Sequence, residues 1–114
     1  MKKTKREKQF IQIHVTFPSK DIAMSLARSL VKEGLVACAQ ISEGITSIYK
    51  WDQRIEEETE VLLALKTAKV NYKLIEEKII SCHPYDTPEV ISFKLGDGSQ
   101  RYYDWLENQL RVEV

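Results

Sequence analysis

The chain has 114 residues, the size of one domain, and such a domain buries roughly two thirds of its unfolded surface without needing a metal or a disulfide to fold. Its 17 lysines and arginines are balanced by 17 aspartates and glutamates, so the molecule has no overall field that would gather nucleic acid or acidic lipid. Cys38 and Cys82 are far apart and in no Cys-x-x-Cys pair, which argues against a disulfide framework, a zinc ribbon and a thioredoxin-type motif.

Positive charge is concentrated in the first eight residues, MKKTKREK, where five basic side chains accompany Glu7. We expect residues 1–8 to form a disordered, solvated basic tail and residues 9–114 to form a single domain. A nucleic-acid-binding arm is the alternative, disfavoured because the tail is short and lacks aromatic residues. No apolar stretch is long enough for a signal sequence or a bilayer span. We therefore expect a cytoplasmic protein with neither nucleic acid nor membrane as a partner.

The first elements are a strand and a helix. Phe10–Phe17 alternates apolar and polar residues and predicts a strand, which Pro18 ends. Ser19 is a plausible N-cap for a helix whose apolar residues recur at helical spacing until Gly34 supplies the C-terminal cap.

A long hairpin follows. Residues 35–51 are extended, Asp52-Gln53-Arg54 is a turn, and residues 55–67 return with a charged end near the turn and an apolar far end. Two arms of about a dozen residues reach about 40 Å, beyond what a core of this size covers. The tip must project into solvent or lie on another subunit. Unpaired strand edges favour the second outcome.

The remaining elements complete an α+β fold. Thr67 is expected to cap a helix whose stripe runs from Tyr72 through Ile75 and Ile79 to Cys82, and Pro84 ends that helix at His83. A fourth strand at 90–95 is expected to point Ile91, Phe93 and Leu95 inward, and Ser99 is expected to cap a last helix. The order predicts a ferredoxin-like βαββαβ antiparallel sheet with a long hairpin between its second and third strands and an extra C-terminal helix.

The sequence contains no motif that marks an enzyme or an RNA-binding module. It has no phosphate-cradling glycine loop, no Gly-x-Ser-x-Gly elbow, no His-Glu-x-x-His pair and no RNA-recognition signature on its strands. We therefore expect a non-enzymatic protein.

Cys82 and His83 are adjacent soft-metal ligands with two interpretations. Neighbouring residues on a helix point about 100° apart and chelate one ion poorly, unless the helix unwinds, which Pro84 favours. The structural alternative makes Cys82 a core residue that continues the apolar stripe, and makes His83 a cap for carbonyls at a helix end.

Five further residues are candidates for a ligand cleft. Three of them, Glu60, Lys66 and Glu89, are charged residues on or beside strands that enter apolar surroundings, where a charge needs a partner or a ligand. An intersubunit ion pair is the alternative for these. Trp51 and Tyr85 could wall a cleft, although aromatic residues are more often core or interface.

Several stretches together resemble one protein family. "VACAQI", "GITSIYKWDQRIEEETEVLLALKT", "HPYDTPEVISF" and "YYDWL" are similar to the CutA divalent-cation-tolerance proteins from Phe10 to Leu110, nearly the whole chain. The resemblance implies a ferredoxin-like fold related to the nitrogen-signalling PII proteins. It also implies a homotrimer in which each long hairpin extends a neighbour's sheet.

The resemblance also implies ligand positions. A cysteine in the first strand and a His-His pair before proline are metal-linked in the bacterial pattern; here these positions hold Val15, Cys82 and His83. Cys82 replaces one soft ligand by another suited to Cu(I), while Val15 removes the strand thiol and argues against a preformed three-ligand site. An intersubunit cleft is implied at Trp51, Glu60, Lys66, His83, Tyr85 and Glu89.

Three functions follow as hypotheses. The leading one is a non-enzymatic homotrimer that binds copper or another divalent ion weakly and contributes to metal tolerance. The second is a PII-like signalling trimer that binds a small anionic effector at Lys66 in an intersubunit cleft. The third is a structural trimer that scaffolds a protein partner through Glu56, Glu57 and Glu58.

Overall fold

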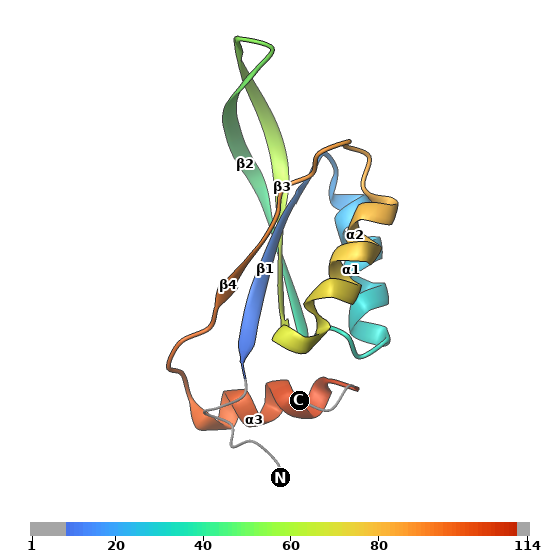
Figure 1. Ribbon diagram of the computed structural model, residues 1–114, viewed down its shortest axis with the longest axis vertical. Helices are drawn as coiled ribbons and strands as arrows, with labels where there is room; N and C mark the ends of the chain where they lie inside the picture. The colour runs from blue at the N-terminus through green and yellow to red at the C-terminus, as the bar shows by residue number, and fades with distance from the viewer. Residues whose placement is uncertain (1–8, 112–114) are drawn as a thin grey trace.

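The computed structural model describes residues 9–111, and the predicted basic tail lies outside them. Residues 9–111 form a mixed fold with one four-stranded antiparallel sheet and three α-helices, which confirms the predicted βαββαβ order with a C-terminal helix (Figure 1). No helix in the described part of the chain is long and apolar enough to cross a membrane. The elements in chain order are β1 (Phe10–Phe17), α1 (Lys20–Lys32), β2 (Cys38–Trp51), β3 (Arg54–Ala68), a 3₁₀ turn (Lys69–Asn71), α2 (Tyr72–Cys82), β4 (Val90–Lys94) and α3 (Gln100–Gln109).

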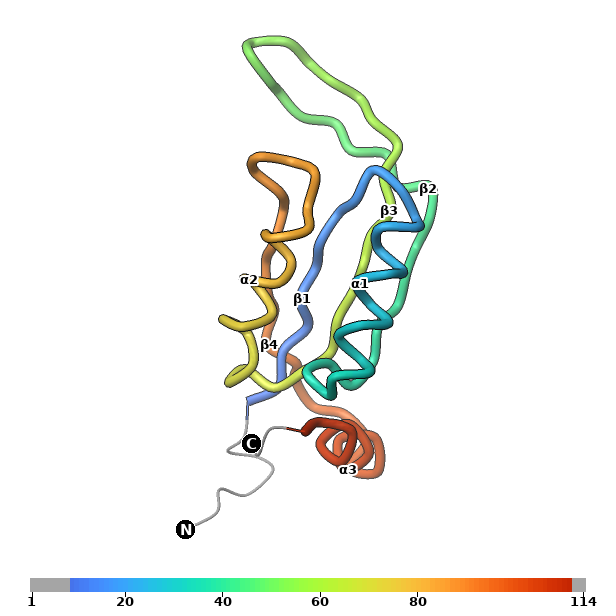
Figure 2. The backbone as a smooth tube through the Cα atoms, turned by 90° about the vertical axis from the view of Figure 1, so that its right-hand side faces the viewer, coloured from blue at the N-terminus to red at the C-terminus, as the bar shows by residue number. Residues whose placement is uncertain are grey.

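The sheet has the strand order β2-β3-β1-β4, so β1 and β3 are central and β2 and β4 are edges. Helices α1 and α2 lie side by side on one face of the sheet, and α3 lies across its foot (Figures 1 and 2). Alternate residues of the central strands point at α1 and α2 and are fully buried, because side chains of a strand alternate between faces. The largest of these are Ile13, Val15, Phe17, Leu63 and Leu65.

The hairpin formed by β2 and β3 is the longest feature of the molecule, with strands of 14 and 15 residues. Its turn residues, Asp52 and Gln53, have φ of 49° and 66°, as a two-residue type I′ turn requires. Gly44 adopts φ 73° at the irregularity between Ser42 and Ile45, where glycine makes a bulge inexpensive. Because β1 pairs with β3 only as far as Val61, residues 54–60 of β3 pair with β2 alone. The hairpin therefore projects beyond the body (Figure 1).

The face predicted for β4 is wrong. Val90 and Ser92 pair with the buried residues Val15 and Ile13, which places Ile91 and Phe93 on the opposite face of the sheet. No helix among the described residues covers that face, and Ile91 and Phe93 are each 48% exposed. The period of two identified the strand, but only the antiparallel register against β1 decides which set of side chains faces the helices.

The predicted cap at Thr67 is also wrong, because β3 continues through Thr67 to Ala68. The Thr67 hydroxyl donates to the Leu35 carbonyl at 2.6 Å, and the Asn71 amide donates to the same carbonyl at 3.2 Å. Residues 35–37, predicted to be extended, form a buried connection ahead of β2. These two bonds satisfy the Leu35 carbonyl, a buried polar group that no strand pairs.

Helix α1 ends at Lys32, and Gly34 terminates it as predicted. This residue has φ 74°, and the amides of Gly34 and Leu35 donate to the carbonyls of Val31 and Leu30. The Gly34 carbonyl in turn accepts from the Arg111 amide at 2.9 Å, which joins the end of α1 to the chain after α3.

Gly34→Ala should lower the free energy of unfolding by about 2 kcal/mol or more, since it combines strain at positive φ with a clash. A Cβ at Gly34 would lie 2.8 Å from the Arg111 Cβ. Gly44→Ala is the matched control, because Gly44 has nearly the same φ and no atom within 4 Å of an added Cβ. Gly44→Ala should lower the free energy of unfolding, measured by urea denaturation, by only about 1 kcal/mol. Equal losses of unfolding free energy in the two variants would show that Arg111 moves aside at no cost, which would contradict the predicted clash.

Candidate functional site

A compact polar cluster lies where the end of β1, the base of the hairpin and the loop between α2 and β4 meet. His83 is at its centre. It directly follows α2 and has extended backbone angles (φ −76°, ψ 135°), because the following proline disfavours helical geometry. Its ring stacks on the buried Phe17 ring with centroids 4.5 Å apart and planes inclined by 20°. The predicted end of this helix is confirmed.

Both ring nitrogens of His83 take part in hydrogen bonds. Nε2 lies 2.7 Å from the Thr16 carbonyl oxygen, and the Tyr85 amide donates to Nδ1 at 3.1 Å. A carbonyl oxygen only accepts, so Nε2 carries the hydrogen and Nδ1 is the acceptor. These contacts assign a neutral imidazole with its proton on Nε2.

Tyr85 connects this ring to the hairpin. Its hydroxyl donates to Glu60 Oε2 at 2.9 Å, and Glu60 is only 6% exposed. Desolvation, followed by the hydrogen bond and negative charge of Glu60, raises the pKa of Tyr85 to about 12. The phenol therefore stays protonated at neutral pH and remains a donor. Within residues 9–111, no lysine or arginine forms an ion pair with Glu60.

Cys82 lies beside this cluster but is not a core residue, as the apolar stripe of α2 had suggested. The buried residues of that helix are Ile75 and Ile79, and Cys82 is exposed. The thiol donates to the Ile79 carbonyl oxygen at 3.5 Å. Desolvation raises the pKa of Cys82 above its ordinary value, so little thiolate is present at neutral pH. Cys82 is the last residue of the helix, and its side chain lies outside the buried core.

Cys82 and His83 do not fit a preformed metal centre. The only lone pair on a ring nitrogen of His83 already accepts a hydrogen bond from the Tyr85 amide. The Cys82 thiol is protonated, so neither residue offers a ready ligand to a metal ion. In the part of the chain that the structure describes, no group of three or more His, Cys, Asp or Glu side chains could hold a metal ion.

The other residues predicted for the cleft lie elsewhere in a single chain. Trp51 adjoins the hairpin turn and is 57% exposed, opposite Arg54. Lys66 lies six residues along β3 from Glu60, about 20 Å at strand rise, and donates from Nζ to Gln40 Oε1 at 2.7 Å. Glu89 is exposed in the loop before β4. One chain therefore brings together only His83, Tyr85 and Glu60.

Two contributors to the cluster, Thr16 and Phe17, were not among the predicted site residues. Thr16 acts through its backbone carbonyl, which no residue pattern can reveal, and Phe17 was predicted only as the end of a strand. His14 lies on the open face of the sheet, where its ring packs edge-on against Phe93 with centroids 4.9 Å apart.

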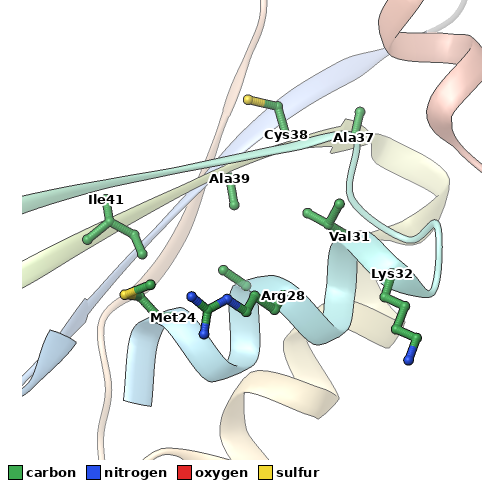
Figure 3. A pocket seen from close by; sticks show the side chains of 9 residues that line it. Met24, Arg28, Val31, Lys32, Ala37, Cys38, Ala39 and Ile41 are labelled. Carbon is green, nitrogen blue, oxygen red and sulfur yellow. The ribbon is translucent and has the colours of Figure 1, made fainter. Parts of the chain in front are cut away.

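An open groove of about 520 Å³ lies between α1 and the edge strand β2, away from the cluster. Figure 3 shows Ala39 and Ile41 pointing toward α1 and Cys38 pointing away from it. Arg28 and Lys32 of α1 supply its positive charge. None of the predicted metal-ligating or cleft residues lines it.

Comparison with known proteins gives one consistent family. Residues 11–109 match the model of the CutA1 divalent ion tolerance protein. The chain is 38% identical over 92 residues to the divalent-cation tolerance protein CutA of Thermus thermophilus, covering 81% of this chain and 89% of that relative. It is also 38% identical over 101 residues to the chloroplastic protein CutA of Arabidopsis thaliana, of which it spans only 56%. The crystal structure of CutA1 from Oryza sativa superposes with a TM-score of 0.86 at 36% identity, covering 90% of this chain and 94% of that one.

Proposed function

The chain belongs to the CutA1 divalent ion tolerance family, and from that membership we propose that it serves divalent-cation tolerance as a non-enzymatic homotrimer that binds copper or another divalent ion weakly. The match over residues 11–109 is the observation that carries the proposal. The assembly and the metal each have separate physical support. A cytoplasmic location remains part of the proposal.

The assembly is supported by what one chain leaves uncovered. Strands β2 and β4 are both open edges, and unpaired N–H and C=O groups of an edge favour pairing with another chain. The open face of the sheet carries Ile91 and Phe93, and the hairpin exposes Ile48 and Ile55. Because the two edges differ, pairing of one with the other is head-to-tail, and three copies form a closed ring when each is rotated by a third of a turn from the next. In such a ring each hairpin extends its neighbour's sheet.

Weak metal binding is supported by the state of the two candidate ligands. The exposed Cys82 thiol is accessible to an ion, but its raised pKa makes metal compete with a proton. His83 could join it only by giving up the bond from Tyr85. One free ligand without a preformed site is consistent with loose binding of a soft ion.

Sedimentation equilibrium at several concentrations should give three times the mass of one chain down to micromolar protein. Phe93→Lys should dissociate the assembly, since it places a charge on the open sheet face. Val70→Lys is the matched control, because Val70 is also exposed but follows β3 on the side of α2. A monomer at micromolar concentration, or equal dissociation by both variants, would contradict the proposed assembly.

Calorimetric titration with Zn²⁺ tests the metal contribution. Affinity should rise between about pH 7 and about pH 8.5, approaching about tenfold per pH unit, because the raised pKa of Cys82 keeps the thiol protonated at the lower pH. Cys82→Ser should abolish this rise, whereas Cys38→Ser should retain it. A serine variant at position 82 that binds Zn²⁺ as the parent does would exclude the thiol as a ligand.

A second candidate function is favoured by Lys66. Its ammonium group donates to Gln40, and within the described residues it forms no ion pair. A free cation on the open sheet face suits a small anionic effector held between subunits, as in a PII-like signalling trimer.

Thermal-shift screening with nucleotides and small carboxylates separates the effector function from metal binding. A true effector at 100 times its Kd should stabilise the protein by about 2.7 kcal/mol. Lys66→Met should remove that gain, and Lys94→Met should not. If no anion stabilises the parent protein beyond the Lys66→Met variant, the effector function is wrong.

A further inference from the structure

We propose that His83 is a positioning residue that fixes the loop between α2 and β4 against the end of β1 and orients Tyr85 toward Glu60, and that it is not a resident metal ligand of this fold. The inference concerns a residue of the proposed metal site. It rests on contacts within the chain, and it holds whether or not the protein binds metal.

The first step concerns the ring itself. A neutral imidazole has one lone pair available to a metal, and in this chain the lone pair on Nδ1 accepts the Tyr85 amide at 3.1 Å. A shift of the proton to Nδ1 would turn a lone pair of Nε2 toward the Thr16 carbonyl oxygen 2.7 Å away, and two acceptors would then face each other. Rotation of the ring would disrupt its stacking on Phe17. Every route to coordination breaks a contact that now holds the loop.

The second step concerns what those contacts connect. Thr16 is next to the last residue of β1, and Glu60 is the first residue of β3 beyond the reach of β1, whose last pair is Phe17 with Val61. The contacts run from the Thr16 carbonyl to His83, then to the Tyr85 amide, and from the Tyr85 hydroxyl to Glu60. They bridge the point where the projecting part of the hairpin begins.

The third step concerns Glu60. Its carboxylate is nearly buried, and among the described residues its hydrogen bond comes from Tyr85. A buried carboxylate that loses its donor is strongly disfavoured, so the placement of Tyr85 determines whether Glu60 remains buried. His83 controls that placement because it holds the Tyr85 amide. His83 therefore stabilises the contacts at the base of the hairpin, and its ring is unavailable to a metal ion.

The experiment compares variants that separate the ring's contacts. His83→Phe keeps an aromatic ring for Phe17 but removes both hydrogen bonds. His83→Asn is the conservative rescue, since its side-chain oxygen lies near the position of Nδ1 and can accept the amide of residue 85. Tyr85→Phe is the matched control: it removes the bond to Glu60 and leaves the ring's partners in place.

Without metal, nitrogen NMR should show the His83 ring neutral with its hydrogen on Nε2, and hydrogen exchange should show a protected residue-85 amide. That protection should fall about fivefold or more in His83→Phe and return toward the parent value in His83→Asn. It should persist in Tyr85→Phe. A ring protonated on Nδ1 in the parent protein, or protection in His83→Phe within about twofold of the parent, would overturn the proposal.

Zn²⁺ titration of the parent protein and of Cys82→Ser completes the test. Metal binding that shifts the NMR signals of Cys82 but leaves those of the His83 ring nitrogens unchanged supports the positioning role. Coordination at the His83 ring with the residue-85 amide still protected overturns it. Absence of Zn²⁺ binding contradicts the proposed metal function alone, because the metal-free exchange result then decides the role of His83 by itself.

Discussion

The structure depends on a mismatch in strand length. The hairpin strands have 14 and 15 residues, whereas the central strand β1 has eight. Where β1 pairs with β3, α1 and α2 cover one face of the sheet and enclose an apolar core. Beyond Val61 the hairpin has only its own two strands, and a two-stranded ribbon is marginally stable alone. The exposed apolar side chains of the hairpin, Ile48 and Ile55, are a consequence of this constraint.

The polar cluster at the base of the hairpin lies where the pairing of β3 with β1 ends. At Glu60 the chain leaves the part of the sheet that β1 supports, and it does so with a nearly buried carboxylate. The phenol of Tyr85 satisfies that carboxylate, and His83 holds the Tyr85 amide. The family resemblance implies a metal-binding role for His83, whereas the contacts of this chain support the positioning role that we propose for its ring. The described part of one chain contains no group of three or more side chains that could hold a metal ion.

Errors in the sequence-based predictions share a cause. Thr67 has the composition of a helix cap, but the strand pairing extends past it and uses its hydroxyl for a buried carbonyl. Cys82 continues a helical stripe by spacing, but it is the last residue of α2 and is exposed. Phe93 and Ile91 belong to an apolar alternation, but β4 pairs with β1 through the other set. In each case the local pattern could not show which neighbours the tertiary structure would place around the residue.

The sequence by itself determined the element order, the ends of α1 and α2, the excessive length of the hairpin and the family. These depend on periodicity, on Gly34 and Pro84, and on motifs that are local in the chain. Only the tertiary structure decided which predicted residues meet: His83, Tyr85 and Glu60 do, while Trp51, Lys66 and Glu89 lie apart. The physical reason is that strand register and helix packing set distances between residues remote in sequence. The acceptor that fixes the His83 ring is a backbone carbonyl, which every residue has and no sequence pattern distinguishes.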